Sequence, residues 1–188
     1  LRSTLSTLEE LEISHSIISS NFLNHCSEVC GSIMTAMPKM KNRPRPSAIK
    51  LLRLTNNQWI SSSSSLSSSC ILGLATLLDC LPKLTALDLS NNLRLFNDCN
   101  HTNDVAEVEH LPHHHRPMVE LCHCTVQQSI RNLSVRNCGL DVPDLRALSS
   151  TFVFLEGLDL SDNPLLMNDL SPLLEFPSPL KELIMANQ

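Results

Sequence analysis

A nine-residue frame that recurs along the chain constrains its fold more than any other feature. The segment LTALDLSNN, residues 84–92, has apolar side chains at its first, fourth and sixth positions and asparagine at its ninth. Sliding this spacing along the sequence gives five further matches, so the frame is a repeat. The three anchors of each copy are Leu8, Leu11 and Ile13; Ile49, Leu52 and Leu54; Leu84, Leu87 and Leu89; Ile130, Leu133 and Val135; Leu155, Leu158 and Leu160; Leu180, Leu183 and Met185.

The ninth position of the frame carries a polar or thiol side chain, which suits a buried turn that needs a hydrogen bond. Five copies have Ser16, Asn57, Asn92, Cys138 and Asn163 there, and only the last copy, ending at Gln188, departs from the pattern. With this frame the chain resembles the leucine-rich repeat superfamily, and in particular its intracellular, ribonuclease-inhibitor-like members with cysteine-containing repeats. The resemblance spans nearly the whole chain.

Each frame predicts a short strand with one buried face, because its apolar residues alternate with polar ones. Such strands are too short to be stable alone, so successive copies must stack in parallel around a common core. We expect strands near 11–13, 52–54, 87–89, 133–135, 158–160 and 183–185. The predicted fold is α/β: one leucine-rich repeat domain over residues 1–188, a horseshoe-shaped solenoid with strands on its concave face and helices or loops on its convex face.

The segments between the strands predict helices and loops. The last two repeats are 25 residues long, enough for a short helix in VPDLRALSS, with Leu145 and Leu148 inward, and in NDLSPLLEF, capped by Asn168 or Asp169. The segment CILGLATLLDCLPKL predicts another helix, ended by Pro82; its expected inward residues are Leu72, Leu74, Leu77, Leu78 and Leu81. The earlier repeats are longer, and we assign their excess to loops at 38–47, 61–69 and 99–125.

The third insertion offers the chief alternative chemistry, because cysteine and histidine crowd between residues 99 and 124. A zinc site there would use Cys99, His101, Cys122 and Cys124. One residue separates Cys122 from Cys124, which is closer than zinc knuckles usually place their ligands, so a histidine-rich loop without metal is favoured. We expect no cofactor, and a regulatory metal-binding element at 99–124 stays an alternative.

Catalysis is not expected. The sequence has no glycine-rich phosphate loop, H-E-x-x-H or G-x-S-x-G motif. Asp159 and Asp162 could pair as carboxylates, but the repeat already accounts for them as solvated residues. Cys138 could be a nucleophile, but it occupies the turn position, where a buried thiol has a packing role.

Charge and cysteine usage bear on partners and compartment. The formal net charge of −5 is too mild for nonspecific binding to nucleic acid or phospholipid, and no apolar run reaches the length of a membrane span. The scattered cysteines favour reduced thiols and an intracellular protein of the cytoplasm or nucleus. Sequons at Asn100 and Asn132 keep an extracellular receptor or matrix protein open. Because the chain begins at a repeat boundary and lacks polar caps, we expect a fragment of a longer protein.

Residues between the anchors should form the concave face, where their charges alternate in sign from one strand to the next. Such banding favours a protein or peptide partner over a nucleic-acid backbone. The expected binding residues are Glu10, Glu12, Arg53, Asn56, Asp88, Asn91, Arg131, Arg136, Glu156 and Asp159. The resemblance implies the same role, since relatives include ribonuclease-inhibitor-like proteins, adaptor subunits of ubiquitin ligases and innate immune sensors. The sequence selects no partner, pathway or oligomeric state.

Overall fold

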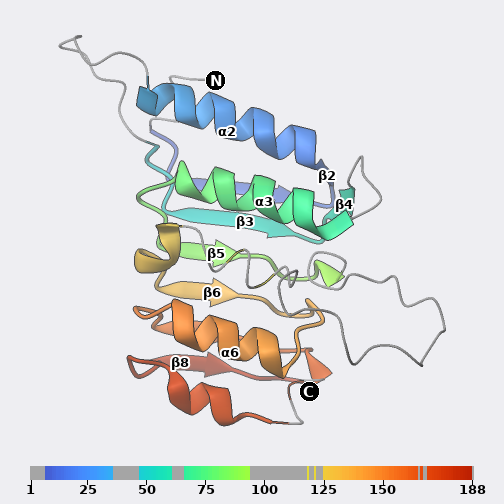
Figure 1. Ribbon diagram of the computed structural model, residues 1–188, viewed down its shortest axis with the longest axis vertical. Helices are drawn as coiled ribbons and strands as arrows, with labels where there is room; N and C mark the ends of the chain where they lie inside the picture. The colour runs from blue at the N-terminus through green and yellow to red at the C-terminus, as the bar shows by residue number, and fades with distance from the viewer. Residues whose placement is uncertain are drawn as a thin grey trace.

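The chain forms a mixed α/β structure built on one parallel sheet (Figure 1). The computed structural model describes residues 7–35, 47–60, 66–93, 118, 121, 125–164, 166 and 169–187. Six strands pair in chain order, and every pair is parallel. They are β1 (Glu10–Ser14), β3 (Leu51–Thr55), β5 (Ala86–Asp88), β6 (Asn132–Ser134), β7 (Gly157–Asp159) and β8 (Glu182–Ile184). Each strand therefore lies in one copy of the frame.

The frame also sets the register of the sheet. The fourth-position anchors stand opposite one another across every pair of strands, in the order Leu11, Leu52, Leu87, Leu133, Leu158 and Leu183. Because successive side chains of a strand point to opposite faces, this register brings the anchors of all six strands to one face. The four central anchors, from Leu52 to Leu158, are at most 2% exposed.

A left-handed turn follows each strand. Among the described residues other than glycine, six have positive φ, between 50° and 61°, and all six occupy the eighth position of the frame: His15, Asn56, Asn91, Asn137, Asp162 and Asn187. Histidine, asparagine and aspartate are the side chains that tolerate this conformation best after glycine. After each of these six strands the chain thus passes through a residue with a similar positive φ.

The ninth-position side chains tie each turn to the preceding repeat. Asn92 Nδ2 donates to the carbonyl oxygens of Leu54 and Leu89, and its Oδ1 accepts from Asn57 N at 3.0 Å and from Trp59 Nε1 at 2.8 Å. Asn163 repeats this pattern: its Nδ2 donates to Val135 O and Leu160 O, and its Oδ1 accepts from Cys138 N and Leu140 N. Buried amides therefore satisfy backbone groups that would otherwise lack partners.

Helices cover one side of the sheet (Figure 1). They are α2 (Ser20–Thr35), α3 (Leu66–Asp79) and α6 (Val142–Thr151), with the 3₁₀ turns η3 (Thr125–Gln128) and η5 (Ser171–Glu175). The predicted helix at 142–150 is α6: Asp141 caps it in a capping box with Asp144, and Leu145 and Leu148 are fully buried. The helix predicted in NDLSPLLEF is the 3₁₀ turn η5, whose N-cap residue is Leu170. The proposed cap Asp169 lies one residue earlier and accepts from Ser171 N at 2.8 Å. Helix α2 was not predicted.

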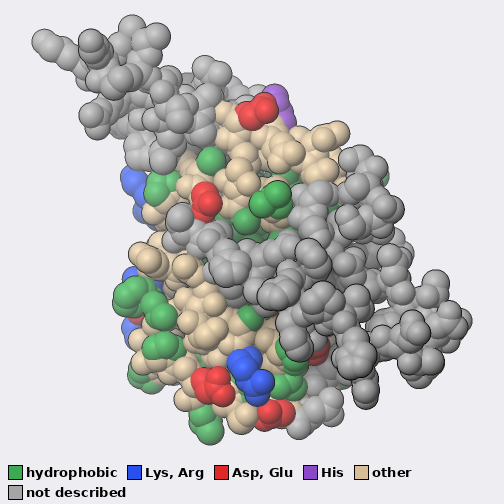
Figure 2. Space-filling model, in the orientation of Figure 1, with side chains coloured by type: hydrophobic (Ala, Val, Ile, Leu, Met, Phe, Trp, Pro, Cys, Tyr) green, Lys and Arg blue, Asp and Glu red, His purple; other side chains and the backbone are tan. Residues whose placement is uncertain are grey.

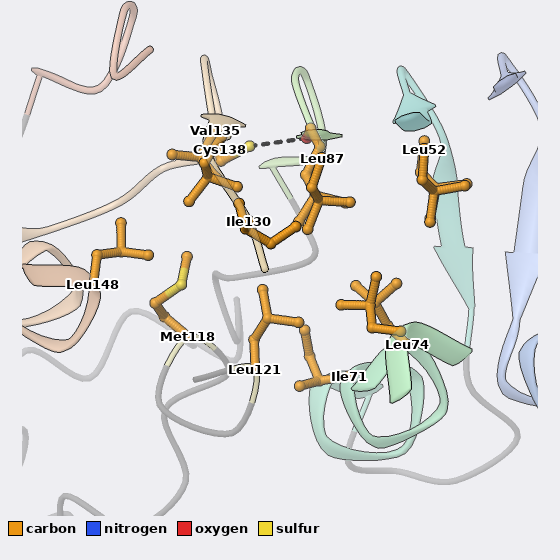
Figure 3. Packing of buried hydrophobic residues seen from close by; sticks show 14 of the residues in the cluster. Leu52, Ile71, Leu74, Leu87, Met118, Leu121, Ile130, Val135, Cys138 and Leu148 are labelled. Carbon is orange, nitrogen blue, oxygen red and sulfur yellow. Dashed lines mark hydrogen bonds between the residues drawn. The ribbon is translucent and has the colours of Figure 1, made fainter. Parts of the chain in front are cut away.

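The core lies between the sheet and these helices (Figure 3). Leu52 and Leu87 point from the strands toward Ile71 and Leu74 of α3, while Met118 and Leu121 pack beside them. Burying an aliphatic side chain of this size stabilises the fold by about 1.5–3 kcal/mol. Figure 2 shows the helical side from outside, where the described acidic and basic side chains are scattered rather than gathered.

Two of the predicted loops need correction. Residues 66–69 belong to α3, so the loop assigned to 61–69 extends too far; the run of serines hid this start, although serine is tolerated at helix N-termini. The loop assigned to 99–125 contains Met118 and Leu121, which are fully buried, and Thr125, which begins η3. Residues 38–46 lie outside the described part of the chain, and Ser47 is buried.

One residue of α3 was assigned to the wrong face. Leu72 was expected to point inward, but it is 67% exposed, and Ile71 is buried in its place. Ile71, Leu74 and Leu78 follow the spacing of one helical face, whereas Leu72 is turned about 100° away from Ile71. An exposed leucine in an apolar run cannot be separated from its buried neighbours by composition alone.

A second, two-stranded sheet was not predicted. Strand β2 (Ile17–Ser19) pairs in parallel with β4 (Gln58–Ile60) just after the turns of the first two repeats. Trp59 of β4 is 5% exposed and hydrogen-bonded to Asn92. The small sheet thus binds the first three repeats to one another.

Candidate interaction surface

The side of the main sheet opposite the helices presents the third and fifth positions of each frame. We call this the open face. Its third-position residues are Glu10, Leu51, Ala86, Asn132, Gly157 and Glu182, and its fifth-position residues are Glu12, Arg53, Asp88, Ser134, Asp159 and Ile184. The three described α-helices all lie on the other side of the sheet, so none of them covers this face (Figure 1).

A hollow of about 320 Å³ lies on the open face. Residues from five strands, β3 to β8 of the main sheet, line it. Its lining includes the small residues Ala86, Ser134 and Gly157, and the side chain of Asn132, which stands between Ala86 and Gly157. A Cβ atom at Gly157 would lie 2.5 Å from Asn132 Oδ1, so a side chain at this position would displace the Asn132 side chain. We call this feature the central hollow.

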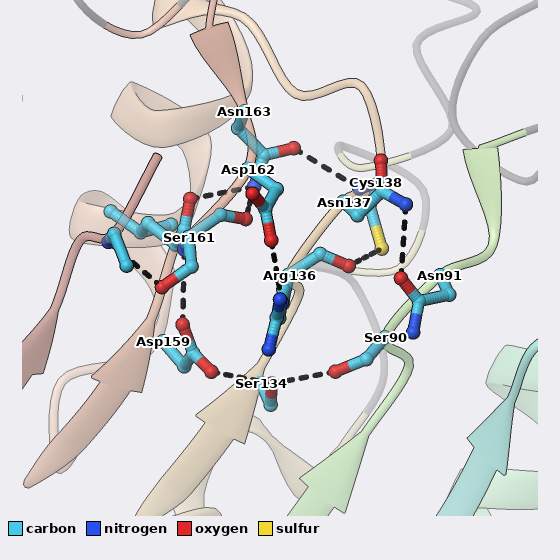
Figure 4. Close-up of polar contacts among 12 residues, drawn as sticks. Ser90, Asn91, Ser134, Arg136, Asn137, Cys138, Asp159, Ser161, Asp162 and Asn163 are labelled. Atoms are coloured by element: carbon cyan, nitrogen blue, oxygen red, sulfur yellow. Dashed lines mark hydrogen bonds and ion pairs between the residues drawn. The ribbon is translucent and has the colours of Figure 1, made fainter. Parts of the chain in front are cut away.

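A chain of hydroxyls and carboxylates runs from one repeat to the next beside the central hollow (Figure 4). Ser90 Oγ donates to Asp88 Oδ1 at 2.6 Å and lies 2.7 Å from Ser134 Oγ. Ser134 Oγ donates to Asp159 Oδ2 at 3.4 Å, and Asp159 Oδ1 accepts from Ser161 N at 3.0 Å. The side chains around the hollow are therefore held in defined positions before any partner arrives.

Most basic side chains near the sheet are already paired across neighbouring strands. The ion pairs are Lys50 with Glu9 at 2.9 Å, Arg53 with Glu10 at 3.6 Å, Arg136 with Asp162 at 2.6 Å and Lys181 with Glu156 at 2.8 Å. The Arg131 guanidinium lies 4.9 Å from the centre of the Phe154 ring. The banded charges expected from the sequence thus largely neutralise one another between strands.

The residues expected to bind a partner fall into three groups: some lie on the open face, some lie next to a strand, and two belong to turns. Glu10, Glu12, Arg53, Asp88 and Asp159 lie on the open face. Arg131 and Glu156 precede β6 and β7, and Arg136 follows β6. The uncharged residues of the open face that line the hollow were not predicted; they are Leu51, Ala86, Asn132, Ser134, Gly157 and Ile184. The third and fifth frame positions would have located them.

The other two expected residues belong to turns. Asn56 and Asn91 are the left-handed residues that follow β3 and β5. Asn91 Oδ1 accepts from Asn137 Nδ2 of the next repeat at 2.9 Å (Figure 4). Both asparagines therefore have a conformational role at the edge of the open face.

The structure bears differently on the proposed zinc site and on the pair of carboxylates. Cys99, His101, Cys122 and Cys124, proposed as zinc ligands, lie outside the described residues. Across the described ranges, no group of three His, Cys, Asp or Glu side chains is placed to hold a metal ion. Asp159 accepts hydrogen bonds from Ser134 and Ser161, and Asp162 pairs with Arg136. Each of these two carboxylates thus has a structural partner.

Cys138 is a buried thiol at the ninth position of its frame. It is 0% exposed, and its Sγ donates to Leu89 O at 3.1 Å (Figure 3). Burial raises the pKa of Cys138 to about 12, against 9.0 for an ordinary thiol. Because the thiolate is the reactive form of cysteine, this environment suits packing and not nucleophilic attack.

The raised pKa predicts a loss of stability at alkaline pH. In the unfolded chain Cys138 ionises near pH 9, whereas the folded protein keeps it protonated until about pH 12. The free energy of unfolding should therefore fall as pH rises through this window, by up to about 1.4 kcal/mol per pH unit. Urea denaturation of wild type and Cys138→Ala from pH 8 to 11 checks this: the wild-type slope should be steeper, and parallel slopes would refute the assignment.

The chain matches no protein-family model and no curated protein. None of the helices in the described part of the chain combines the length and apolar character that crossing a membrane requires.

Proposed function

We propose that this chain is a non-enzymatic leucine-rich repeat module that binds a protein or peptide on its open face. The observation that carries the proposal is the open face itself: five neighbouring strands line one hollow, and the described helices lie on the opposite side. A binding surface built on a rigid sheet holds its side chains in fixed positions, which lowers the entropy cost of binding.

Repetition at every level supports the leucine-rich repeat reading. Strands pair in chain order, anchors stand in register, and the same left-handed turn follows each strand. These features match what a repeat solenoid needs, in which each unit buries its apolar edge against the next. The recurrence of one geometry in six frames is difficult to obtain in a sheet whose strands have unrelated sequences.

An intracellular location belongs to the same proposal. Cys26, Cys70, Cys80 and Cys138 are free thiols, and burial raises the pKa of each. Free thiols in this number fit a reducing compartment better than the outside of the cell. Mass analysis of protein from its native source, before and after reduction and deglycosylation, tests this point against the extracellular alternative.

Filling the central hollow tests the binding proposal without assuming what the partner looks like. Ala86→Tyr places a large side chain into the hollow at an outward-facing strand position where aromatic residues are well tolerated. Ser150→Tyr, at an exposed position of α6, is the matched control. We expect proteins captured from cell extract by the wild type to be lost with Ala86→Tyr, by at least about tenfold, and kept with Ser150→Tyr.

The capture has clear readings provided that both variants keep the circular dichroism spectrum of the wild type. Loss of the same partner with Ala86→Tyr alone places binding on the open face. Equal capture by all three proteins would overturn the proposal, because a ligand seated in the hollow cannot share it with a tyrosine ring.

A further inference from the structure

We propose that the partner enters the central hollow with a Lys or Arg side chain, which lies over Ser134 between Asp88 and Asp159. The inference rests on the proposed function, since it names the chemistry of the ligand for the same face.

The charges of the hollow that form no ion pair within the described part of the chain are acidic. Among the described residues that line it, Asp88, Asp159 and Glu182 bring carboxylates and Arg53 brings a guanidinium. Arg53 lies 3.6 Å from Glu10, whereas the described lysines and arginines form no ion pair with any of the three carboxylates. A complementary ligand therefore brings positive charge, and a polyanion such as nucleic acid would be repelled.

The positions of Asp88, Ser134 and Asp159 suit a single cationic group. These residues stand directly opposite one another on β5, β6 and β7. Because neighbouring strands lie about 4.8 Å apart, a cation over Ser134 has a carboxylate about 5 Å away on each side. The hydrogen bonds described for the Asp88 carboxylate both end at Oδ1, so Oδ2 is open to a ligand within the described part of the structure.

The surroundings leave room for such a side chain. At the third frame position of the same three strands lie Ala86, Asn132 and Gly157. Ala86 and Gly157, on either side of Asn132, project no long side chain into the hollow. The methylene stem of a Lys or Arg can lie along this floor while the charged end meets the carboxylates. Charge-assisted hydrogen bonds of this kind are roughly twice as strong as neutral ones.

A phage-displayed library of random nine-residue peptides is the probe. It is selected in parallel on the wild type, on Asp88→Asn/Asp159→Asn, and on the control Glu28→Gln/Glu175→Gln. The control removes two carboxylates as well, from exposed positions on α2 and η5. The asparagine variant keeps oxygen acceptors for Ser90 N and Ser161 N, so its turns should persist, which circular dichroism verifies.

We expect the wild type and the control to select peptides with Lys or Arg at one fixed position. A synthetic peptide of the selected sequence should bind the asparagine variant at least about tenfold more weakly, and replacing its basic residue by glutamine should weaken binding to the wild type similarly. Both effects should shrink at high salt.

The other outcomes overturn the inference in two distinguishable ways. Peptides that lack a basic residue, or bind the asparagine variant as well as the wild type, yet lose binding to Ala86→Tyr, would leave the proposed function standing without its basic ligand. Binding that survives Ala86→Tyr, or a library that yields no binder, would count against the open face and the inference together.

Discussion

Replacing Asn92 by alanine is expected to lower the free energy of unfolding by about 3–5 kcal/mol, because two or more buried groups would lose their hydrogen-bond partners at about 1–3 kcal/mol each. Asn92 is 1% exposed. Its amide serves the carbonyls of Leu54 and Leu89, the backbone N–H of Asn57 and the indole of Trp59. Urea denaturation followed by circular dichroism measures the loss.

A graded series separates hydrogen bonding from simple loss of volume. Cys138 takes the same frame position in the next repeat, where its thiol donates to Leu89 O. Asn92→Cys should therefore cost less than Asn92→Ala, because the thiol can still donate to a carbonyl. Asn21→Ala, at an exposed position of α2, is the control and should change stability by no more than about 0.5 kcal/mol. A loss below about 1 kcal/mol for Asn92→Ala would contradict the role given to the buried amides.

Leu158→Ala should cost roughly 2–5 kcal/mol, the range for removing a buried leucine and leaving a cavity. Leu158 is 1% exposed and stands between Leu133 and Leu183 in the row of fourth-position anchors. Leu174→Ala is the matched control, because this leucine of η5 is 90% exposed. Thermal and urea denaturation of the two variants should give a large difference; equal losses would mean that the anchor row is not the core of the stack.

The main sheet could be predicted because the nine-residue frame occurs six times, and each copy contains one strand. Each copy of the anchors marks a strand, and the fixed spacing sets the register that brings Leu87 opposite Leu133. The left-handed turns were not predicted, although the eighth position is always histidine, asparagine or aspartate. A residue type that recurs at a turn position has a conformational meaning that periodicity of apolar residues does not reveal.

Features outside the frame were harder to predict for physical reasons. Helix α2 has few strong helix formers and gains stability by packing on α3, where Gly73 brings the helix close to Leu23. Pairing of β2 with β4 joins three-residue segments that lie far apart in the sequence. At the candidate site, the charged residues expected from the sequence lie on or next to the strands, but pairs such as Lys50 with Glu9 were not predicted, because they depend on register and turn geometry together.

The open face can be tested most directly by labelling carboxylates with a carbodiimide and glycine ethyl ester, with and without a peptide selected on the wild type. The measurement compares Asp88, Asp159 and Glu182 in the central hollow with Glu28 and Glu175 on the helical side, by mass spectrometry of proteolytic fragments. We expect the peptide to protect the three carboxylates of the hollow and to leave the labelling of the other two unchanged. Protection confined to Glu28 or Glu175 would place binding on the helical side and contradict binding on the open face.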